Sequence, residues 1–386
     1  MIAIETPLTL AYLKGLVRIN SVNPGLVSGG AGEGEVAAWL HRTCRELGLD
    51  VQVQESAPGR PNVLACWPGS GKGKSLLLAG HTDVVGTENM VGNPFDARVE
   101  DGRLYGRGAL DMKGGLAAIL SAVAALRSDG FHPAGDIWLG FVTDEEYLSV
   151  GMDALVQQIH TDAAILTEPT GMDICIAHKG FAWLTITTHG KAAHGSLYDT
   201  GVDAISHMGR VLNVLQHLER DVFPAREHPL LGRSSGHASF INGGLGLSTY
   251  PDQCTLQVEH RLLPDTTDAD LLALWQKALA ELAAADPEFH AEVKLDFARP
   301  GYEISRNAPV VQTIDRAYQA VMGSEANYGG MYAWLDSAIL QDAGIPTVIL
   351  GPGGEGMHAA VEYVELEDVY RCAAVLAETA ALWTGA

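Results

Sequence analysis

The chain has 386 residues, of which 47% are hydrophobic and 19% are charged, and it contains 44 glycines. Its 25 lysines and arginines stand against 47 aspartates and glutamates, which gives a formal net charge of −22 at pH 7. The composition excludes a disordered or fibrous chain, and so acidic a surface repels phosphate backbones and anionic lipid headgroups. We therefore expect no nucleic acid and no membrane as a partner. At roughly 100–200 residues per domain, the length predicts two or three domains, and we take two as the starting count.

The amino-terminal residues predict a soluble, cytoplasmic protein. Residues 1–7 lack the basic and apolar stretches of a secretory signal, and no apolar run is expected to reach the roughly 18–20 residues of a membrane span. The five cysteines are scattered along the chain and never form a Cys-x-x-Cys pair. We interpret them as small, buried hydrophobic residues.

The first third of the chain alternates helical and extended patterns. In chain order, helices are predicted at 8–19 and 35–47, strands at 51–55, 62–67 and 75–80, a helix at 114–127 and a strand at 136–143. The segment 75–80 is apolar throughout, which is typical of a strand buried on both faces. This alternation predicts an α/β fold in which a mostly parallel sheet carries helices on both faces.

From about residue 181 the pattern changes to a compact β-α-β-β-α-β order. Its elements are predicted at 181–188, 202–219, 238–241, 253–262, 269–285 and 291–297, and the α/β pattern then resumes with a helix at 308–322, a strand at 347–350 and a helix at 367–383. A unit of this order can fold as a layer of its own. We therefore predict a main domain formed by residues 1–177 and 297–386, with a second domain inserted at 178–296.

Side chains of the metal-binding type stand where predicted strands end, and ligands bind at that edge of an open α/β sheet. His81 and Asp83 directly follow the strand 75–80, and side chains two residues apart point to the same side. An imidazole whose other nitrogen is held by a carboxylate suits a zinc ligand and its support. A solvated turn is the alternative for this pair taken alone.

The glycine-rich turn at 106–115 contains Asp111 and opens onto the helix predicted at 114–127. Gly106-x-Gly108 has the start of a dinucleotide-binding motif, but Asp111 stands where the third glycine is required, and a carboxylate there would repel pyrophosphate. A carboxylate that bridges metal ions suits the position better.

Three further positions extend the set. Glu145 and Glu146 end the strand 136–143, where neighbouring carboxylates can face opposite ways, one as a metal ligand and the other as a base. A solvated cluster of charge is the alternative. Glu168 follows a strand predicted at 163–166, and His358 ends a flexible loop after the strand 347–350.

Five strand ends thus offer two histidines, one aspartate and two glutamates as ligands. Nitrogen and oxygen donors of this kind suit zinc, with cobalt or manganese as substitutes. The set contains no cysteine and no His-Glu-x-x-His helix, which disfavours a structural zinc site and the zincin class of protease.

In combination these motifs resemble the family of acetylornithine deacetylase, succinyl-diaminopimelate desuccinylase and glutamate-releasing carboxypeptidases, which are dizinc hydrolases. The resemblance covers nearly the whole chain. It rests on Gly80-His81-Thr82-Asp83-Val84-Val85, Gly106-Arg107-Gly108 with Asp111-Met112-Lys113-Gly114, Asp144-Glu145-Glu146, Glu168-Pro169-Thr170, Ala192-Ala193-His194, and Gly351-Pro352-Gly353 with His358.

The resemblance implies two zinc ions in an aminopeptidase-like catalytic domain. His81 and Glu168 would bind one ion, and Glu146 and His358 would bind the other. Asp111 would bridge the two.

It also implies the parts played by their neighbours. Asp83 would orient His81, and Glu145 would act as general base and then as general acid on a water held between the metal ions. The peptide bond between Asp111 and Met112 would be cis.

For the inserted unit, the resemblance implies a ferredoxin-like lid and dimerisation domain. His194 would reach the active site of the partner subunit in a homodimer and stabilise the oxyanion, and Arg261 would hold the substrate carboxylate. The alternatives are an ordinary loop histidine and a strand arginine paired with a nearby acid.

The implied activity is hydrolysis of the amide bond of a small N-acyl amino acid, N-acetylornithine or a close relative, as in arginine biosynthesis. A dipeptidase or carboxypeptidase acting on small peptides is the alternative, because the attack on the amide is the same. A non-catalytic binding protein would be expected to lose Glu145 or a ligand, and this chain keeps all six. Ser248, Tyr147 and Ser149 depart from the family pattern, which leaves the acyl group open.

Overall fold

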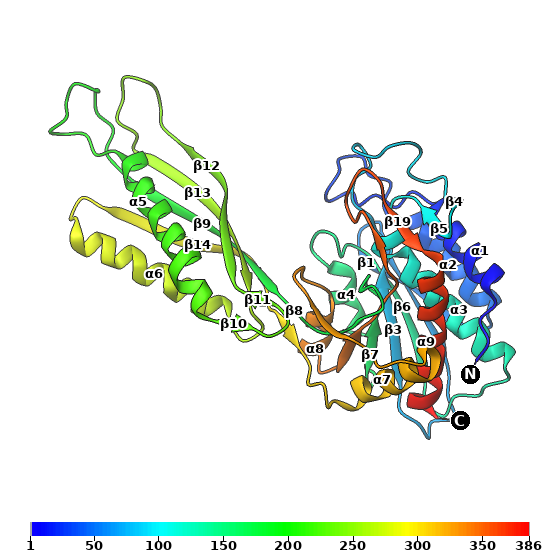
Figure 1. The fold of residues 1–386 in the computed structure, drawn as a ribbon. Coiled ribbons are helices and arrows are strands. Elements are labelled where there is room, and N and C mark those ends of the chain that lie inside the picture. Colours follow the sequence, from blue (N-terminus) through cyan, green and yellow to red (C-terminus); the bar gives the residue numbers. More distant parts are fainter. Residues whose placement is uncertain (1, 386) are drawn as a thin grey trace. The chain divides into compact units, whose positions relative to one another are not determined.

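The computed structural model describes residues 2–385 and divides the chain into two compact units (Figure 1). The first unit comprises the chain up to Ile176, residues 304–329 and the chain from Leu335 onward. The second comprises residues 177–303 and 330–334. The insertion predicted at 178–296 lies within this second unit, which also takes in residue 177 and the segments 297–303 and 330–334, all predicted for the main domain.

A mixed sheet forms the centre of the first unit, with the strand order β1-β2-β6-β3-β7-β17-β8. The strands are β1 (Asp50–Ala57), β2 (Arg60–Trp67), β3 (Leu76–His81), β6 (Ile137–Val142), β7 (Ala164–Leu166), β8 (Ile174–His178) and β17 (Thr347–Ile349). The four strands β6, β3, β7 and β17 run parallel, whereas β2 and β8 flank them in the antiparallel sense. The central strand β3 is buried along its whole length, as its apolar sequence predicts.

Helices cover both faces of this sheet, which confirms the predicted α/β class. They are α1 (Thr6–Val17), α2 (Gly34–Glu46), α3 (Gly114–Ser128), α4 (Val150–Leu155), α7 (Pro309–Met322), α8 (Ser337–Asp342) and α9 (Leu366–Thr384). Helices α1, α3, α7 and α9 pack together, while α4 packs on β1, β2 and β6 and contacts α8. Short strands complete the unit: β4 (Arg98–Glu100), β5 (Arg103–Tyr105), β18 (Gly354–Glu355) and β19 (Tyr363–Glu365).

One expectation about apolar runs was wrong. The helical stretch Ala109–Ser128, which includes α3, is long and apolar enough to cross a membrane by length and composition. Because 94% of its apolar window is buried inside the fold, it is the core helix of the first unit. The five cysteines are free and buried, as predicted.

The second unit has the predicted β-α-β-β-α-β order. Its elements are β9 (Gly180–His189), α5 (Ala204–His217), β12 (Ser235–Gly243), β13 (Gln253–Leu262), α6 (Asp268–Ala285) and β14 (His290–Arg299). The antiparallel sheet has the order β12-β13-β9-β14, and its apolar face packs on α5 and α6 around the buried Trp275. Asp203 caps α5 and a Thr267–Asp270 capping box starts α6, so both helices begin at a side-chain acceptor.

Smaller elements join these. They are the hairpin β10 (Glu227–His228) and β11 (Gly232–Arg233), β15 (Tyr302–Glu303) and β16 (Tyr328–Met331), which both pair with β8, a π-helical turn (Ala109–Lys113) before α3, and two further turns (Leu218–Val222 and Phe223–Ala225) after α5.

Candidate metal centre

Three side chains from separate segments meet at the carboxyl end of the parallel strands. His81 is the last residue of β3, Asp111 lies in the turn before α3, and Glu168 follows β7. His81 Nε2 lies 3.1 Å from Asp111 Oδ1 and 3.8 Å from Glu168 Oε1. All three residues are buried, and they offer ligand atoms within 4.8 Å of one another. We call these residues the first triad.

A second triad shares Asp111 and adds Glu146 and His358. His358 Nε2 lies 3.3 Å from Asp111 Oδ2 and 3.1 Å from Glu146 Oε2. Asp111 therefore turns one carboxylate oxygen toward each histidine, which is the arrangement of a bridging ligand. The His358 side chain is 50% exposed, so the second triad is the open side of the cluster.

The backbone around Asp111 has the geometry that the resemblance implied. The Asp111–Met112 peptide bond is cis. Both residues have non-helical dihedral angles, so the regular helix α3 begins only at Gly114. Met112 lies beneath the end of β3, where its Sδ accepts a hydrogen bond from the His81 backbone N–H at 3.1 Å.

Asp83 contacts His81 through its backbone carbonyl and not through the carboxylate that was expected to orient the imidazole. The His81 Nδ1–H donates to the Asp83 backbone carbonyl at 3.0 Å, whereas the nearer carboxylate oxygen is 3.7 Å away. A carbonyl oxygen can only accept, so Nδ1 carries the proton and Nε2 faces the triad. The carboxylate instead accepts hydrogen bonds from the backbone N–H groups of Glu145 and Glu146, both at 3.2 Å, and from Asn23 Nδ2 at 2.7 Å. It thus fixes the turn that presents the two glutamates.

Glu145 stands beside the cluster without belonging to either triad. Its side chain is 10% exposed, and Oε2 lies 4.0 Å from His81 Nε2. Burial, together with the negative charges of Glu168 and Asp336, raises the pKa of Glu145 well above its usual range. A carboxylate with a raised pKa next to a reacting water suits proton transfer in both directions.

The cluster carries more negative charge than its own side chains balance. Burial raises the pKa of Glu146 to about 7, and burial with neighbouring carboxylates raises that of Glu168 well above its usual range. Among the described residues, Glu168 Oε1 is buried and has no hydrogen-bond partner. An unpartnered carboxylate oxygen beside an imidazole nitrogen fits a bound cation, and the nitrogen and oxygen donors fit zinc.

His194 and Arg261 belong to the second unit and are described within it. His194 is exposed, and its Nδ1 lies 2.8 Å from Ser196 Oγ. Arg261 lies at the end of β13, where Nη2 is 2.6 Å from a carboxylate oxygen of Glu259 and the guanidinium lies over the Phe181 ring at 5.6 Å. The local acid named as the alternative for Arg261 is therefore present.

Two supporting residues were not predicted from the sequence. Asp336 is buried at the start of α8, and its charge helps to raise the pKa of both Glu145 and Glu168. Arg60 on β2 lies 2.9 Å from Asp144, the residue before Glu145. Each is an isolated charge in its own segment, so no spacing pattern marks it; the only signal is a charged residue within an otherwise apolar stretch.

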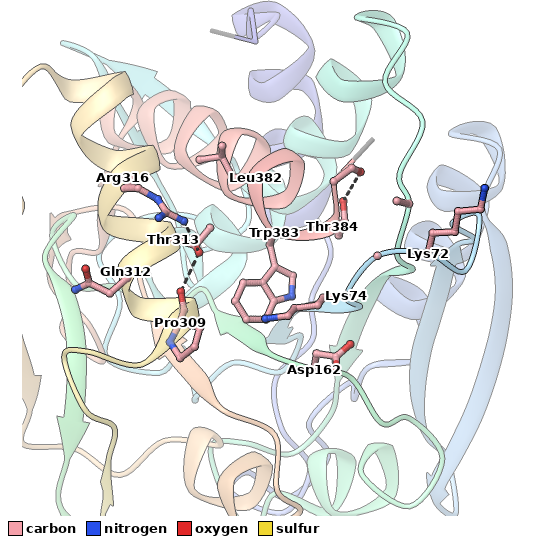
Figure 2. Close-up of a pocket in the computed structure, with 13 residues that line it drawn as sticks. Lys72, Lys74, Asp162, Pro309, Gln312, Thr313, Arg316, Leu382, Trp383 and Thr384 are labelled. Carbon is pink, nitrogen blue, oxygen red and sulfur yellow. Dashed lines mark hydrogen bonds between the residues drawn. The ribbon is translucent and has the colours of Figure 1, made fainter.

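A hollow of about 820 Å³ lies elsewhere in the first unit (Figure 2). It is formed at the amino ends of β3 and β7, near Lys74 and Asp162, by the start of α7 and the end of α9. Asp162 accepts hydrogen bonds from the backbone N–H and the hydroxyl of Ser75. The two triads lie at the opposite, carboxyl ends of these strands, where ligands bind in such sheets.

Comparison with known proteins agrees with this geometry. The chain matches the family described as Peptidase family M20/M25/M40 over residues 77–382, a span that contains both triads. The chain belongs to this family. The predicted family is confirmed. The predicted class of enzyme, a metal-dependent amidohydrolase, is confirmed as well by the family match and by relatives of the chain.

Relatives in the M20 family align over most of the chain. An acetylornithine deacetylase from Aliivibrio fischeri is 32% identical over 365 residues, covering 92% of each chain. An N-formyl-4-amino-5-aminomethyl-2-methylpyrimidine deformylase from Halalkalibacterium halodurans is 28% identical over 363 residues, covering 86% of this chain and 84% of the relative. The crystal structure of the aminopeptidase PepT from Bacillus cereus matches with a TM-score of 0.82 at 19% identity, covering 99% of this chain and 100% of that one, which shows the shared fold.

Proposed function

We propose that the protein removes the acyl group from a small N-acyl amino acid by hydrolysing its amide bond, with two zinc ions bound at the two triads. The observation that supports this most directly is the position of Asp111, whose two oxygens face His81 and His358 while Glu145 stays free beside them. A shared carboxylate and a spare one are what a two-metal hydrolase requires.

In this proposal the first triad holds one ion and the second triad holds the other, with Asp111 common to both. Bound zinc would polarise the amide carbonyl as a Lewis acid and would lower the pKa of a water to about 7. Cobalt or manganese, which accept the same nitrogen and oxygen donors, would substitute.

Glu145 moves the proton. Its carboxylate takes a proton from the attacking water and then gives it to the nitrogen of the leaving amine, so that a free amino acid and a small carboxylate are formed. The positive charge of metal ions bound at the triads would favour the ionised form of Glu145 and offset the rise in its pKa that burial causes. General acid–base catalysis of this kind typically contributes about 10²–10⁴-fold to the rate.

The relatives support a small acyl group. They are named as a deacetylase and a deformylase, so acetyl and formyl amides are the first substrates to test. Small peptides remain the alternative, because the same attack opens a peptide bond and because the fold is shared with an aminopeptidase.

We further propose a cytoplasmic homodimer formed through the second unit, with Arg261 holding the substrate carboxylate and His194 acting in the partner's site. Large apolar side chains on this unit are exposed, among them Phe240 at 72%, Leu245 at 67% and Leu247 at 109%. These three lie on the edge strand β12 and in the loop that follows it, and exposed apolar groups so close together are typical of a surface that another protein covers.

Two neighbouring glutamates provide the sharpest test of the proposed function. Glu145→Gln should lower kcat by about 10²–10⁴-fold on the best amide of an N-acetyl, N-formyl, N-succinyl and dipeptide panel, while the protein still binds two zinc ions. Glu146→Gln should instead lose the ion of the second triad. If metal-loaded wild type released no amine from any substrate, or if Glu145→Gln retained full activity, the proposal would be wrong.

The action of His194 across a dimer has its own test. Subunits with His194→Ala are mixed with subunits carrying Glu145→Ala, so that one site in each heterodimer has both residues intact. Recovery of part of the activity is expected. Heterodimers that form but stay inactive would contradict the proposed role of His194.

A further inference from the structure

A fully buried ion pair lies next to the candidate metal centre. Arg107 follows β5 and Glu362 precedes β19, and the two side chains, each 1% exposed, approach to 2.8 Å between Nη1 and Oε2. Removing two charges from water is costly, and well-packed apolar side chains often stabilise a fold as well or better. Stabilising the fold therefore does not by itself account for this pair, and its other contacts indicate a second role.

Glu362 holds the backbone of the shared ligand. Its Oε1 accepts hydrogen bonds from the N–H groups of Leu110 at 3.0 Å and of Asp111 at 3.2 Å. These residues lie in the turn Ala109–Lys113 before α3, where the dihedral angles of Asp111 and Met112 depart from helical values. The position of the Asp111 carboxylate thus depends on a side chain that is 251 residues away in the sequence.

Arg107 holds the loop that carries His358. Its Nη2 donates to the carbonyl of Ala359 and to Asn89 Oδ1, both at 3.2 Å. Asn89 Nδ2 in turn donates to the carbonyl of His358 at 3.1 Å. His358 has a φ of 60°, a left-handed conformation that is uncommon for a non-glycine residue.

From these contacts we propose that the Arg107–Glu362 pair positions the ligands of the second triad by tying the Asp111 backbone to the His358 loop. The two residues are positioning residues, since neither contacts the metal ligands' donor atoms. This inference rests on the proposed two-metal function. The first triad depends less on the pair, because His81 ends the buried strand β3 and Glu168 follows β7.

Metal binding provides a readout that is independent of activity. Arg107→Lys keeps the charge but loses the planar fork, and Glu362→Gln replaces one acceptor of the carboxylate with a donor. Supporting residues of metal ligands typically change affinity by 10–100-fold when they are mutated. We expect calorimetric titration of metal-stripped protein with Zn²⁺ to show one binding event weakened by about 10–100-fold in both variants, with the other event, whose His81 and Glu168 do not depend on the pair, weakened less.

The neighbouring pair Arg103–Glu365 is the matched control. It joins the strands β5 and β19, which adjoin the buried pair, at 2.9 Å, but its side chains are 40% and 36% exposed. Exposed ion pairs contribute little, so Arg103→Lys and Glu365→Gln should bind both ions like the wild type. The visible absorption of bound Co²⁺ should change in the Arg107 and Glu362 variants and stay unchanged in these controls.

Asn89→Ala tests the same contact network at an exposed residue, in case the buried variants do not fold. Asn89 is exposed, so its loss should leave the thermal unfolding of the metal-free protein nearly unchanged while it weakens the same binding event. If the folded Arg107→Lys and Asn89→Ala proteins bound both ions like the wild type, the inference would be overturned and the proposed function would stand. A wild type that bound fewer than two ions would overturn both.

Discussion

Metal binding should displace protons from the candidate centre, and their number can be worked out from the structure. The hydrogen bonds that the His358 ring donates to Asp111 and Glu146 raise the pKa of His358 to about 10. Burial opposes the protonation of His81, but Glu168, Asp111 and Glu145 together raise its pKa well above the usual range. Burial raises the pKa of Glu146 to about 7.

At pH 7 each imidazole then holds about one displaceable proton, and Glu146 holds about half of one. Metal ligands must be deprotonated, so filling both triads should release at least about 2.5 protons, and any proton on Glu168 or lost from a coordinated water adds to this number. Because at least about 2.5 protons are released, the combined affinity for two ions should fall by at least about 300-fold for each pH unit below 7.

The assay is calorimetric titration of the metal-stripped protein with ZnCl₂ at pH 7 in buffers of different ionisation enthalpy. The slope of the observed heat against the ionisation enthalpy gives the number of protons released. His358→Ala should lower it by about one, whereas His189→Ala, which removes an exposed histidine of the second unit, should not change it. Release of fewer than one proton, or the same number in His358→Ala as in the wild type, would refute the reasoning.

Three further measurements concern stability. Gly209→Ala in α5, where an added Cβ would meet nothing within 4 Å, should raise the free energy of unfolding by about 0.5–1 kcal/mol in urea. Gly115→Ala in α3 should lower it by about 1–3 kcal/mol, because the Cβ would lie 2.2 Å from the Thr167 carbonyl oxygen; an unchanged midpoint would contradict the close packing. Burial lowers the pKa of His260, which accepts a hydrogen bond from Trp275, to about 4 from an ordinary 6.5. As the pH falls, the unfolded chain therefore takes up a proton at this histidine before the folded chain does. The resulting contribution to the free energy of unfolding, about 3 kcal/mol in full, is present above pH 6.5 and is lost toward pH 4. In acid unfolding experiments, His260→Gln should make the free energy of unfolding fall less steeply over this range.

The sequence determined the class of fold and the set of candidate metal ligands because both depend on local pattern. The apolar segment that became β3 marks a buried parallel strand by itself, and the period of α3 marks a core helix. Metal-type side chains at successive strand ends meet because parallel strands bring their carboxyl ends to one edge of a sheet. His81, Asp111, Glu146, Glu168 and His358 were therefore predictable as a group before any coordinates.

Tertiary structure alone decided how these side chains are held. The sheet order, with β2 and β8 antiparallel beside a parallel centre, depends on pairings between segments far apart in the chain, which no local period encodes. The Asp83 carboxylate accepts a hydrogen bond from the Glu145 backbone N–H, whereas the Asp83 backbone carbonyl accepts one from His81. The type of residue at position 83 does not reveal which of its groups makes which contact. Arg107 and Glu362 meet across 255 positions, and only the folded chain shows that this pair ties Asp111 to the His358 loop. Ligand identity follows from side-chain chemistry, whereas ligand position follows from long-range hydrogen bonds that form only when the chain has folded.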